Sequence, residues 1–205
     1  MLITVAINDD DRSFSKALKK LIDAQPDMGC VASFESIAEA KTYLPVVHPD
    51  VLLQDVQMGD GLGCDALDDL LEASPRSSVL MCTAFVRDEY LFRAFKKGAQ
   101  GYIVKSDAPE KIIEAIRQVH RGGNPMSEPV TKRIVDFFRE APKKISLLSA
   151  REIELLGFLA EGCLYKEIAD RMGVKMDTVK KHATTIYKKL GVGNRTQAVN
   201  LYKRQ

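Results

Sequence analysis

The sequence predicts an α/β protein built on a doubly wound sheet of five parallel strands, followed by a second, smaller domain made only of helices. Over the first 120 residues, short β-branched runs alternate with helical patterns, whereas the chain from Ser146 onward carries closely spaced helical patterns and no strand signal. Alternating strands and helices give a parallel sheet covered on both faces. Right-handed crossovers restrict it to an open, doubly wound sheet.

Apolar patterns mark the expected strands and the four clearest helices of the first domain. The strands are expected at Ile3–Ile7, Val31–Phe34, Val51–Leu53, Val79–Cys82 and Tyr102–Val104. Helical spacing joins apolar residues within Phe14–Ile22, Leu67–Leu71, Leu91–Phe95 and Ile112–Val119. If the strand order is 2-1-3-4-5, the first and third strands are neighbours.

The first domain is expected to cover residues 1–122, because RGGNP at Arg121–Pro125 breaks the alternating pattern. A linker of residues 123–145 follows. We expect it to hold a short helix from about Ser127 to Arg139 and a flexible joint at Ala141–Lys144. The helical domain then covers residues 146–205.

Four helices are expected in the second domain. Ser149 and Glu152 are spaced as the N-cap and third helical position of a capping box. The first helix ends at Gly162, with Ile153, Leu156 and Ala160 as its core face. The others are expected at Lys166–Met172, at Asp177–Leu190 and from about Thr196 to the end of the chain.

The charges are unevenly divided, although the formal net charge is only +2. Residues 1–120 hold 13 Lys and Arg against 19 Asp and Glu, a charge of −6, and residues 121–205 hold 17 against 9, a charge of +8. The basic half suggests a polyanionic partner. The alternative is chance unevenness between two solvated surfaces.

Several protein classes are not expected. No apolar stretch approaches the ~18 residues of a membrane span. The N-terminal MLITVAINDDD has no basic segment before its apolar run, so it does not fit a secretory signal. The four cysteines form no C-x-x-C pair, which favours small, mostly buried thiols in a reducing cytoplasm over a zinc site.

Carboxylates follow the ends of two neighbouring strands of the predicted sheet. The first strand ends at Asn8 and is followed by Asp9, Asp10 and Asp11, and the third is followed by Asp55. Carboxylates packed together repel unless they are protonated or bind a cation. Because oxygen ligands suit Mg²⁺, we expect Asp9, Asp10 and Asp55 to bind this ion.

The loop after Asp55 has glycines at 59, 61 and 63, but it does not match a dinucleotide fingerprint, because the sixth position is Cys64. We expect the loop instead to let a backbone carbonyl, that of Gln57, turn toward the metal.

Two further strand ends provide Thr83 with the small Ala84, and Lys105. A hydroxyl and an ammonium facing a metal-bound carboxylate suit the equatorial oxygens of a phosphoryl group. Asp55 is then the nucleophile that becomes an aspartyl phosphate. The alternative is that these polar residues only cap strands at the solvent edge.

The predicted helix Asp177–Leu190 has one apolar face, formed by Val179, Ala183, Ile186 and Leu190. Its other positions include Lys180, Lys181, Thr184 and Lys188. A helix with one buried face and one basic, short-polar face suits the major groove of DNA. The preceding helix and the turn at Gly173 have helix-turn-helix spacing. The alternative is a basic solvated face without a partner.

The first 120 residues resemble a bacterial response-regulator receiver domain, which has a flavodoxin-like fold. The resemblance rests on Asp9-Asp10, on DVQMGDGLG from Asp55, on CTA with Thr83, and on GYIVK ending at Lys105. It implies that Asp55 is the phosphoacceptor and that Asp10 binds Mg²⁺ directly. It also implies that Tyr102 turns inward behind Thr83 after phosphorylation. Two usual prolines are replaced, by Gly59 and by Arg12.

The same resemblance implies that Gln57 and Phe85 flank the route of the water that attacks the aspartyl phosphate. Phe85 is bulky and cannot activate water. We therefore expect it to shield the phosphoryl group.

Residues 148–199, which contain LSAREIELLGFLAEG, KEIADRMGV and TVKKHATTIYKKLGVGNRTQAV, resemble a LuxR-type helix-turn-helix of NarL/FixJ-class transcription factors. The resemblance implies base contacts from Lys180, Lys181 and Thr184, and phosphate contacts from Lys166, Thr178, His182 and Lys188. Leu164 and Tyr165 replace the usual Ser-Asn, and Lys175 replaces the usual Ser cap. We expect the last helix, with Ala198, Val199, Leu201 and Tyr202, to join two such domains.

These observations predict a cytoplasmic, phosphorylation-controlled transcriptional regulator of a two-component system. A sensor histidine kinase or a small phosphodonor would supply the phosphoryl group, and a homodimer would bind a two-fold repeat in double-stranded DNA. We expect no enzymatic activity beyond self-phosphorylation and slow autodephosphorylation.

Two alternatives belong to other functional classes. One is a phosphatase with an aspartyl nucleophile, but such enzymes use D-x-D, and here Gln57 stands two residues after Asp55, in place of the second carboxylate. The other is a phosphorylation-independent transcription factor whose receiver serves as a dimerisation module.

Overall fold

The computed structural model describes residues 2–84 and 86–203, without the side chains of residues 140–144. The chain divides into two compact units, and the division falls between Arg133 and Ile134. Within the described residues, no helix has the length and apolar character needed to cross a membrane.

The first unit is built on a parallel sheet with the strand order β2-β1-β3-β6-β7. This confirms the predicted order 2-1-3-4-5. The five strands are β1 (Ile3–Asn8), β2 (Met28–Phe34), β3 (Val51–Gln54), β6 (Ser78–Thr83) and β7 (Gly101–Val104). A separate antiparallel hairpin, β4 (Gln57–Met58) with β5 (Gly61–Leu62), was not predicted.

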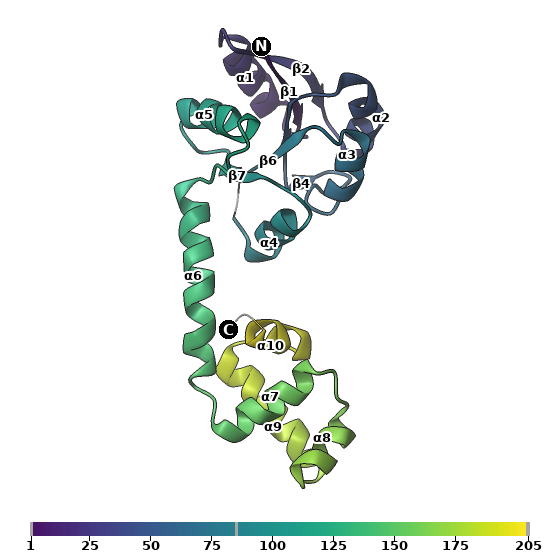
Figure 1. The fold of residues 1–205 in the computed structure, drawn as a ribbon, viewed down its shortest axis with the longest axis vertical. Helices are drawn as coiled ribbons and strands as arrows, with labels where there is room; N and C mark the ends of the chain where they lie inside the picture. The colour runs from purple at the N-terminus through teal and green to yellow at the C-terminus, as the bar shows by residue number, and fades with distance from the viewer. Residues whose placement is uncertain (1, 85, 204–205) are drawn as a thin grey trace. The chain divides into compact units, whose positions relative to one another are not determined.

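Five helices cover the two faces of this sheet (Figure 1). They are α1 (Arg12–Asp23), α2 (Ile37–Val47), α3 (Leu67–Ala73), α4 (Asp88–Lys96) and α5 (Pro109–His120). On one face, Leu18 and Ile22 of α1 and Ile116 of α5 share a buried cluster with the strand residues. Burial of each such side chain contributes about 1.5–3 kcal/mol.

Helix α2 was not among the four helices named from the apolar pattern. Its apolar stripe is unclear because Tyr43 and Val46 are exposed and Pro45 lies inside the helix. The N-terminus does carry a sequence signal. Ser36 is the N-cap and accepts a hydrogen bond from the backbone of Glu39, while the Glu39 carboxylate accepts one from the backbone of Glu35.

Helix α6 (Glu128–Ile145) is longer than expected. The predicted helix ended near Arg139 and was followed by a flexible joint at Ala141–Lys144, but the backbone is helical through these four residues. Pro142 removes one helical hydrogen bond. Alanine and lysine are strong helix formers, so the flanking residues favour continuation of the helix.

The second unit contains α7 (Ala150–Ala160), α8 (Tyr165–Met172), α9 (Met176–Leu190) and α10 (Arg195–Tyr202), as expected. The capping box of Ser149 and Glu152 is present. The predicted core face of α7 was partly wrong. Leu155 and Leu159 are buried beside Leu156, whereas Ile153 and Ala160 are only partly buried.

The burial of Glu152 explains why the buried face of α7 differs from the predicted one. It is only 5% exposed, and its carboxylate lies 2.7 Å from the ammonium of Lys189 on α9. The same carboxylate accepts a hydrogen bond from the backbone of Ser149. With Glu152 turned inward, the buried stripe of α7 continues at Leu155, Leu156 and Leu159.

Replacement of Glu152 by alanine is expected to lower the free energy of unfolding of the second unit by about 2 kcal/mol, because the cap and the ion pair are lost together. Glu154→Ala on the same helix removes only an exposed partner of Arg151, and we expect about 0.5 kcal/mol or less. Thermal unfolding followed by circular dichroism measures both changes. Equal effects of the two variants would contradict the assignment.

The contribution of Glu152 also depends on pH. Burial opposes its ionisation, but hydrogen bonds from Lys189 and Ser149 outweigh burial, so its pKa is lowered from the ordinary value of 4.5. A group with a lowered pKa stabilises the fold above its ordinary pKa and loses that effect as the pH falls through its folded pKa. The stability difference between the parent chain and Glu152→Ala should therefore shrink below pH 4.5.

Candidate functional site

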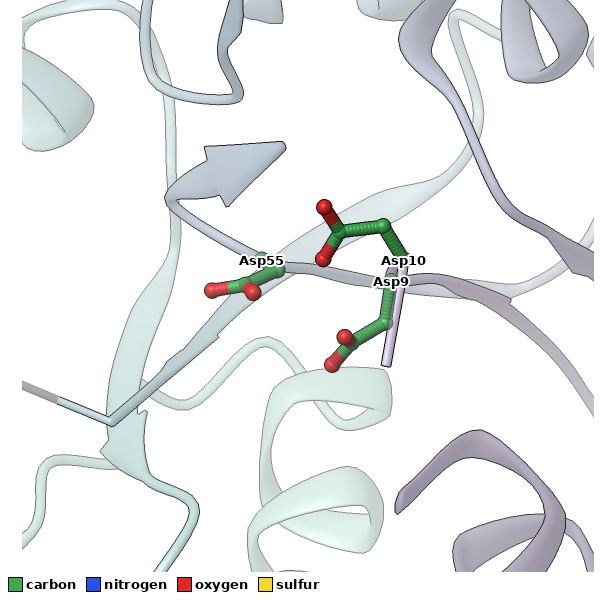
Figure 2. A group of neighbouring side chains, drawn as sticks. All are labelled: Asp9, Asp10 and Asp55. Carbon is green, nitrogen blue, oxygen red and sulfur yellow. The ribbon is translucent and has the colours of Figure 1, made fainter. Parts of the chain in front are cut away.

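Three carboxylates lie together where β1 and β3 end (Figure 2). One oxygen from each of Asp9, Asp10 and Asp55 lies within 4.8 Å of the others, as predicted from the strand order. Asp9 and Asp55 are 2% and 6% exposed, whereas Asp10 is open to solvent. Asp11 does not join them, because its side chain caps α1 by accepting from the backbone of Ser13 and Phe14.

Lys105, which follows β7, neutralises part of this cluster. Its ammonium lies 2.6 Å from a carboxylate oxygen of Asp9 and 2.8 Å from one of Asp55. The ammonium also lies 4.9 Å from the centre of the Phe14 ring, a cation–π distance. The structure therefore confirms that the Lys105 ammonium faces the Asp55 carboxylate.

Burial and these contacts shift the pKa values of Asp9 and Lys105. Burial raises the pKa of Asp9, and the hydrogen bond from Lys105 only partly opposes this effect. Burial also disfavours the charged form of Lys105, but the hydrogen bonds to Asp55 and Asp9 outweigh it and raise the pKa of the ammonium. Lys105 is therefore held in its cationic form.

The carboxylate of Asp55 is held on both sides. One oxygen accepts a hydrogen bond from the backbone of Val56 at 2.6 Å, and the other accepts from Lys105 at 2.8 Å. The backbone N–H of Asp55 donates to the carbonyl of Asn8 at 2.9 Å, which extends the β1–β3 ladder. These two hydrogen bonds fix the orientation of the carboxylate.

Gly63 determines how the loop after Asp55 packs. A Cβ on Gly63 would lie 1.9 Å from the carbonyl oxygen of Asp55 and 2.6 Å from the side-chain nitrogen of Gln54, so only glycine fits. A Cβ on Gly59 would meet nothing closer than 3.6 Å, the distance to a carboxylate oxygen of Asp10. The loop therefore folds back against Asp55 through Gly63.

The remaining predicted pocket residues lie at the same edge of the sheet. Thr83 is the last residue of β6 and is 3% exposed, and its carbonyl accepts from the backbone of Lys105 at 2.8 Å. Ala84 is exposed. Gln57 begins β4, and its backbone N–H faces an Asp55 oxygen at 3.5 Å. Phe85 lies outside the described residues.

Tyr102 on β7 is fully buried, so its ring already occupies the inward position that was expected only after phosphorylation. The ring lies 6.1 Å from that of Phe95 on α4. Burial, with a smaller effect from Cys64, raises the pKa of the phenol. The backbone of Tyr102 is bonded to the segment before α6, accepting from Ser127 and donating to Pro125.

Sequence reasoning missed two buried amides, Asn8 and Gln54, which directly precede Asp9 and Asp55. Both have 0% exposure, and the amide nitrogen of Asn8 donates to the side-chain oxygen of Gln54 at 2.8 Å. The sequence shows their positions but not their burial. Each is an amide at the end of a mainly apolar strand, ITVAIN and VLLQ.

The predicted DNA-reading helix, α9, has the expected two faces. Val179, Ala183, Ile186 and Leu190 are buried. The exposed residues include Lys180, Lys181, Thr184 and Lys188 on α9 and Lys166 on α8, while Thr178 and His182 are partly buried. The hydroxyl of Thr184 donates to the carbonyl of Lys180. A basic face is therefore presented opposite the apolar one.

Helix α10 uses more of its apolar surface within its own unit than expected. Ala198 and Leu201 are buried in the core of the second unit, and Val199 and Tyr202 pack partly against it. A short helix is stabilised by such packing. Only parts of Val199 and Tyr202 remain for a contact with another chain.

Comparisons with known families cover both units. Residues 5–117 match the family model described as the response regulator receiver domain. Residues 146–202 match the family model of bacterial regulatory proteins, luxR family.

Individual proteins match over nearly the whole chain. The DNA-binding transcriptional activator DevR/DosR of Mycobacterium tuberculosis is 34% identical over 200 residues, covering 96% of this chain and 92% of that protein. The oxygen regulatory protein NreC of Staphylococcus aureus is 32% identical over 204 residues, covering 95% and 94%. The structure of the response regulator RcsB from Salmonella typhimurium aligns with a TM-score of 0.69 at 24% identity, covering 97% of each chain, and supports the fold.

The close approach at Gly63 generates a stability prediction. Gly63→Ala is expected to lower the free energy of unfolding by about 3 kcal/mol, because its Cβ overlaps the Asp55 carbonyl. Gly59→Ala, in the same loop, should change it by about 0.5 kcal/mol or less. Urea unfolding followed by circular dichroism separates the two. A Gly63→Ala variant as stable as Gly59→Ala would refute the packing described here.

Proposed function

The chain belongs to the NarL/FixJ class of response regulators, which join a receiver domain to a LuxR-type DNA-binding domain, and on this basis we propose that phosphorylation of Asp55 controls its binding to DNA. The observation that carries the proposal is the set of three clustered carboxylates with the Lys105 ammonium between two of them. The proposed phosphodonor partner is a sensor histidine kinase, and the match to the receiver family supports this proposal.

Mg²⁺ fits the donor set of this pocket. Asp9, Asp10 and Asp55 offer oxygens within 4.8 Å of one another, and two of these carboxylates are buried, where uncompensated charge is costly. The backbone carbonyl of Gln57 is proposed as a further ligand. When bound, the ion neutralises the charge that gathers on the phosphoryl oxygens.

The chemistry proposed for Asp55 is a phosphoryl transfer. A carboxylate oxygen attacks phosphorus, a new O–P bond forms, and the P–N bond of the kinase phosphohistidine breaks, with its electron pair returning to the imidazole. Lys105 then faces a phosphoryl oxygen, and the hydroxyl of Thr83 and the backbone at Ala84 hold the others. Water later cleaves the O–P bond and restores the Asp55 carboxylate.

The proposed signal passes along β7 to the segment before α6. The side chain of Ser127 donates to Asp107, two residues beyond Lys105, and accepts from the backbone of Val104 at 3.0 Å. This segment is also bonded to the backbone of Tyr102 on the same strand. Movement of Lys105 toward a phosphoryl group would therefore change the hydrogen bonds of Ser127, the residue directly before α6.

The second unit is proposed to bind DNA as a dimer. The relative DevR/DosR is described as a DNA-binding transcriptional activator. We propose that residues of α8 and α9 contact both the bases and the phosphates of DNA. The base contacts would come from Lys180, Lys181 and Thr184, and the phosphate contacts from Lys166, Thr178, His182 and Lys188.

The first prediction from this proposal concerns the phosphoacceptor. Asp55→Asn should abolish Mg²⁺-dependent uptake of one phosphoryl group from acetyl phosphate, because the nucleophilic oxygen is removed. Mass measurement of the intact chain tests this. Asp11→Asn is a matched control, since Asp11 lies outside the cluster and asparagine preserves the helix cap. Labelling of Asp55→Asn at the parent rate would refute the assignment.

The second prediction concerns DNA. The operator should be a two-fold repeat whose half-site centres lie ~10 bp apart. Lys181→Ala should cost about 1–3 kcal/mol and change base preference, whereas Lys188→Ala should weaken binding to all sequences and flatten the salt slope by about one unit. Binding titrations across salt concentrations measure both effects.

The matched control for these lysine variants is Lys16→Ala, which removes the same charge from an exposed position on α1. It should leave both base preference and the salt slope unchanged. A parent footprint limited to one half-site, together with Lys181→Ala behaving like Lys16→Ala, would contradict the dimer and the assigned reader.

A further inference from the structure

Two buried amide side chains directly precede carboxylates of the pocket in the sequence. Asn8 and Gln54 are the last residues of β1 and β3, and they are paired in the register of these strands. Neither is exposed at all. Their row continues across the sheet to Phe34 on one side and to Met81 on the other, so the amides lie between large apolar side chains.

A chain of hydrogen bonds joins the amides to the phosphoacceptor. Asn8 donates through its side-chain nitrogen to the Gln54 side-chain oxygen at 2.8 Å, and Gln54 donates through its side-chain nitrogen to the carbonyl of Asp55 at 2.8 Å. The backbone N–H of Asp55 returns to the carbonyl of Asn8 at 2.9 Å. The Asp55 carbonyl is therefore held by the Gln54 side chain, while the Asp55 N–H is held by the backbone of Asn8.

Burial of this amide pair has a cost in stability. A buried amide loses its hydration and must recover it through hydrogen bonds. Among the described residues, the side-chain oxygen of Asn8 has no hydrogen-bond partner. Two apolar side chains of similar volume would remove this unpaired acceptor, but they would leave the Asp55 carbonyl without the donor that Gln54 supplies. The contribution that only the amide pair makes is therefore its hydrogen bond to Asp55.

We propose that Asn8 and Gln54 are positioning residues for the phosphorylation of Asp55, an inference that rests on the proposed function. They precede Asp9 and Asp55, so their mutual hydrogen bond fixes one carboxylate against the other. Gln54 also sits under Gly63, where it supports the loop that folds over the Asp55 carbonyl. Phosphoryl transfer depends on such positioning, since small displacements of reacting groups slow it strongly.

The test replaces the amides by apolar side chains of similar shape. The variants are Gln54→Met, Asn8→Leu and the double variant, with Met81→Leu in the same row as the control that changes packing but no hydrogen bond. The initial rate of phosphoryl uptake by the full chain is measured against acetyl phosphate concentration in Mg²⁺. The thermal midpoint is measured on the same samples, and Mg²⁺ is titrated in the absence of phosphodonor.

We expect Gln54→Met and the double variant to lower the maximal rate about tenfold, with the half-saturating donor concentration within about twofold of the parent value. Asn8→Leu alone leaves the Gln54 oxygen without its donor and should lower the thermal midpoint. The double variant should recover part of the midpoint that Asn8→Leu loses, because no side-chain amide oxygen is then left without a donor, but it should not recover the rate. Met81→Leu should keep the parent rate.

A parent rate in the double variant, or a rate that rises and falls with the thermal midpoint across all variants, would overturn the positioning role. Asp55→Asn, assayed beside them, separates this outcome from failure of the proposed function. If that variant is labelled like the parent, phosphorylation at Asp55 is itself wrong. If it is unlabelled while the double variant reacts at the parent rate, only the inference about the amides fails.

Discussion

The two ion pairs of Lys105, with Asp9 and with Asp55, are the interactions on which the pocket depends. Two nearly buried carboxylates side by side repel each other, and the ammonium between them offsets that repulsion. Removing one partner of a buried ion pair costs about 3–5 kcal/mol, because the remaining charge stays uncompensated. The ammonium follows β7, two strands beyond β3 in the sheet, so the pocket exists only when β1, β3, β6 and β7 lie side by side.

Lys105 also connects the pocket, through β7, to the segment that precedes α6. Strand β7 carries the buried Tyr102, ends one residue before Lys105, and is bonded along its edge to the segment that precedes α6. Because Tyr102 is already buried, the proposed switch does not require its ring to turn inward. The contacts that could change on phosphorylation include those of Lys105 and of the Asp107–Ser127 pair.

The sequence predicted most of the receiver because its chemistry follows the ends of strands. An apolar run followed by a carboxylate, a threonine or a lysine determines both the strand and its functional residue, and the order of strands then brings them together. Asn8 and Gln54 escaped because an amide at the end of a strand gives no sign of whether it is buried. The burial of Glu152 was not predicted either, because its partner Lys189 lies 37 residues away in the sequence. The length of α6 was missed because Pro142 suggested an end that the backbone does not have.

The most direct test of phosphorylation control is the affinity of the full chain for an operator fragment before and after treatment with acetyl phosphate and Mg²⁺, measured at one fixed salt concentration. The account predicts that the Kd changes with the fraction of chains carrying one phosphoryl group, and that it returns to its starting value as the group is hydrolysed. An affinity that stays constant while the mass measurement shows full phosphorylation would contradict it. That result would favour a receiver that serves only as a dimerisation module.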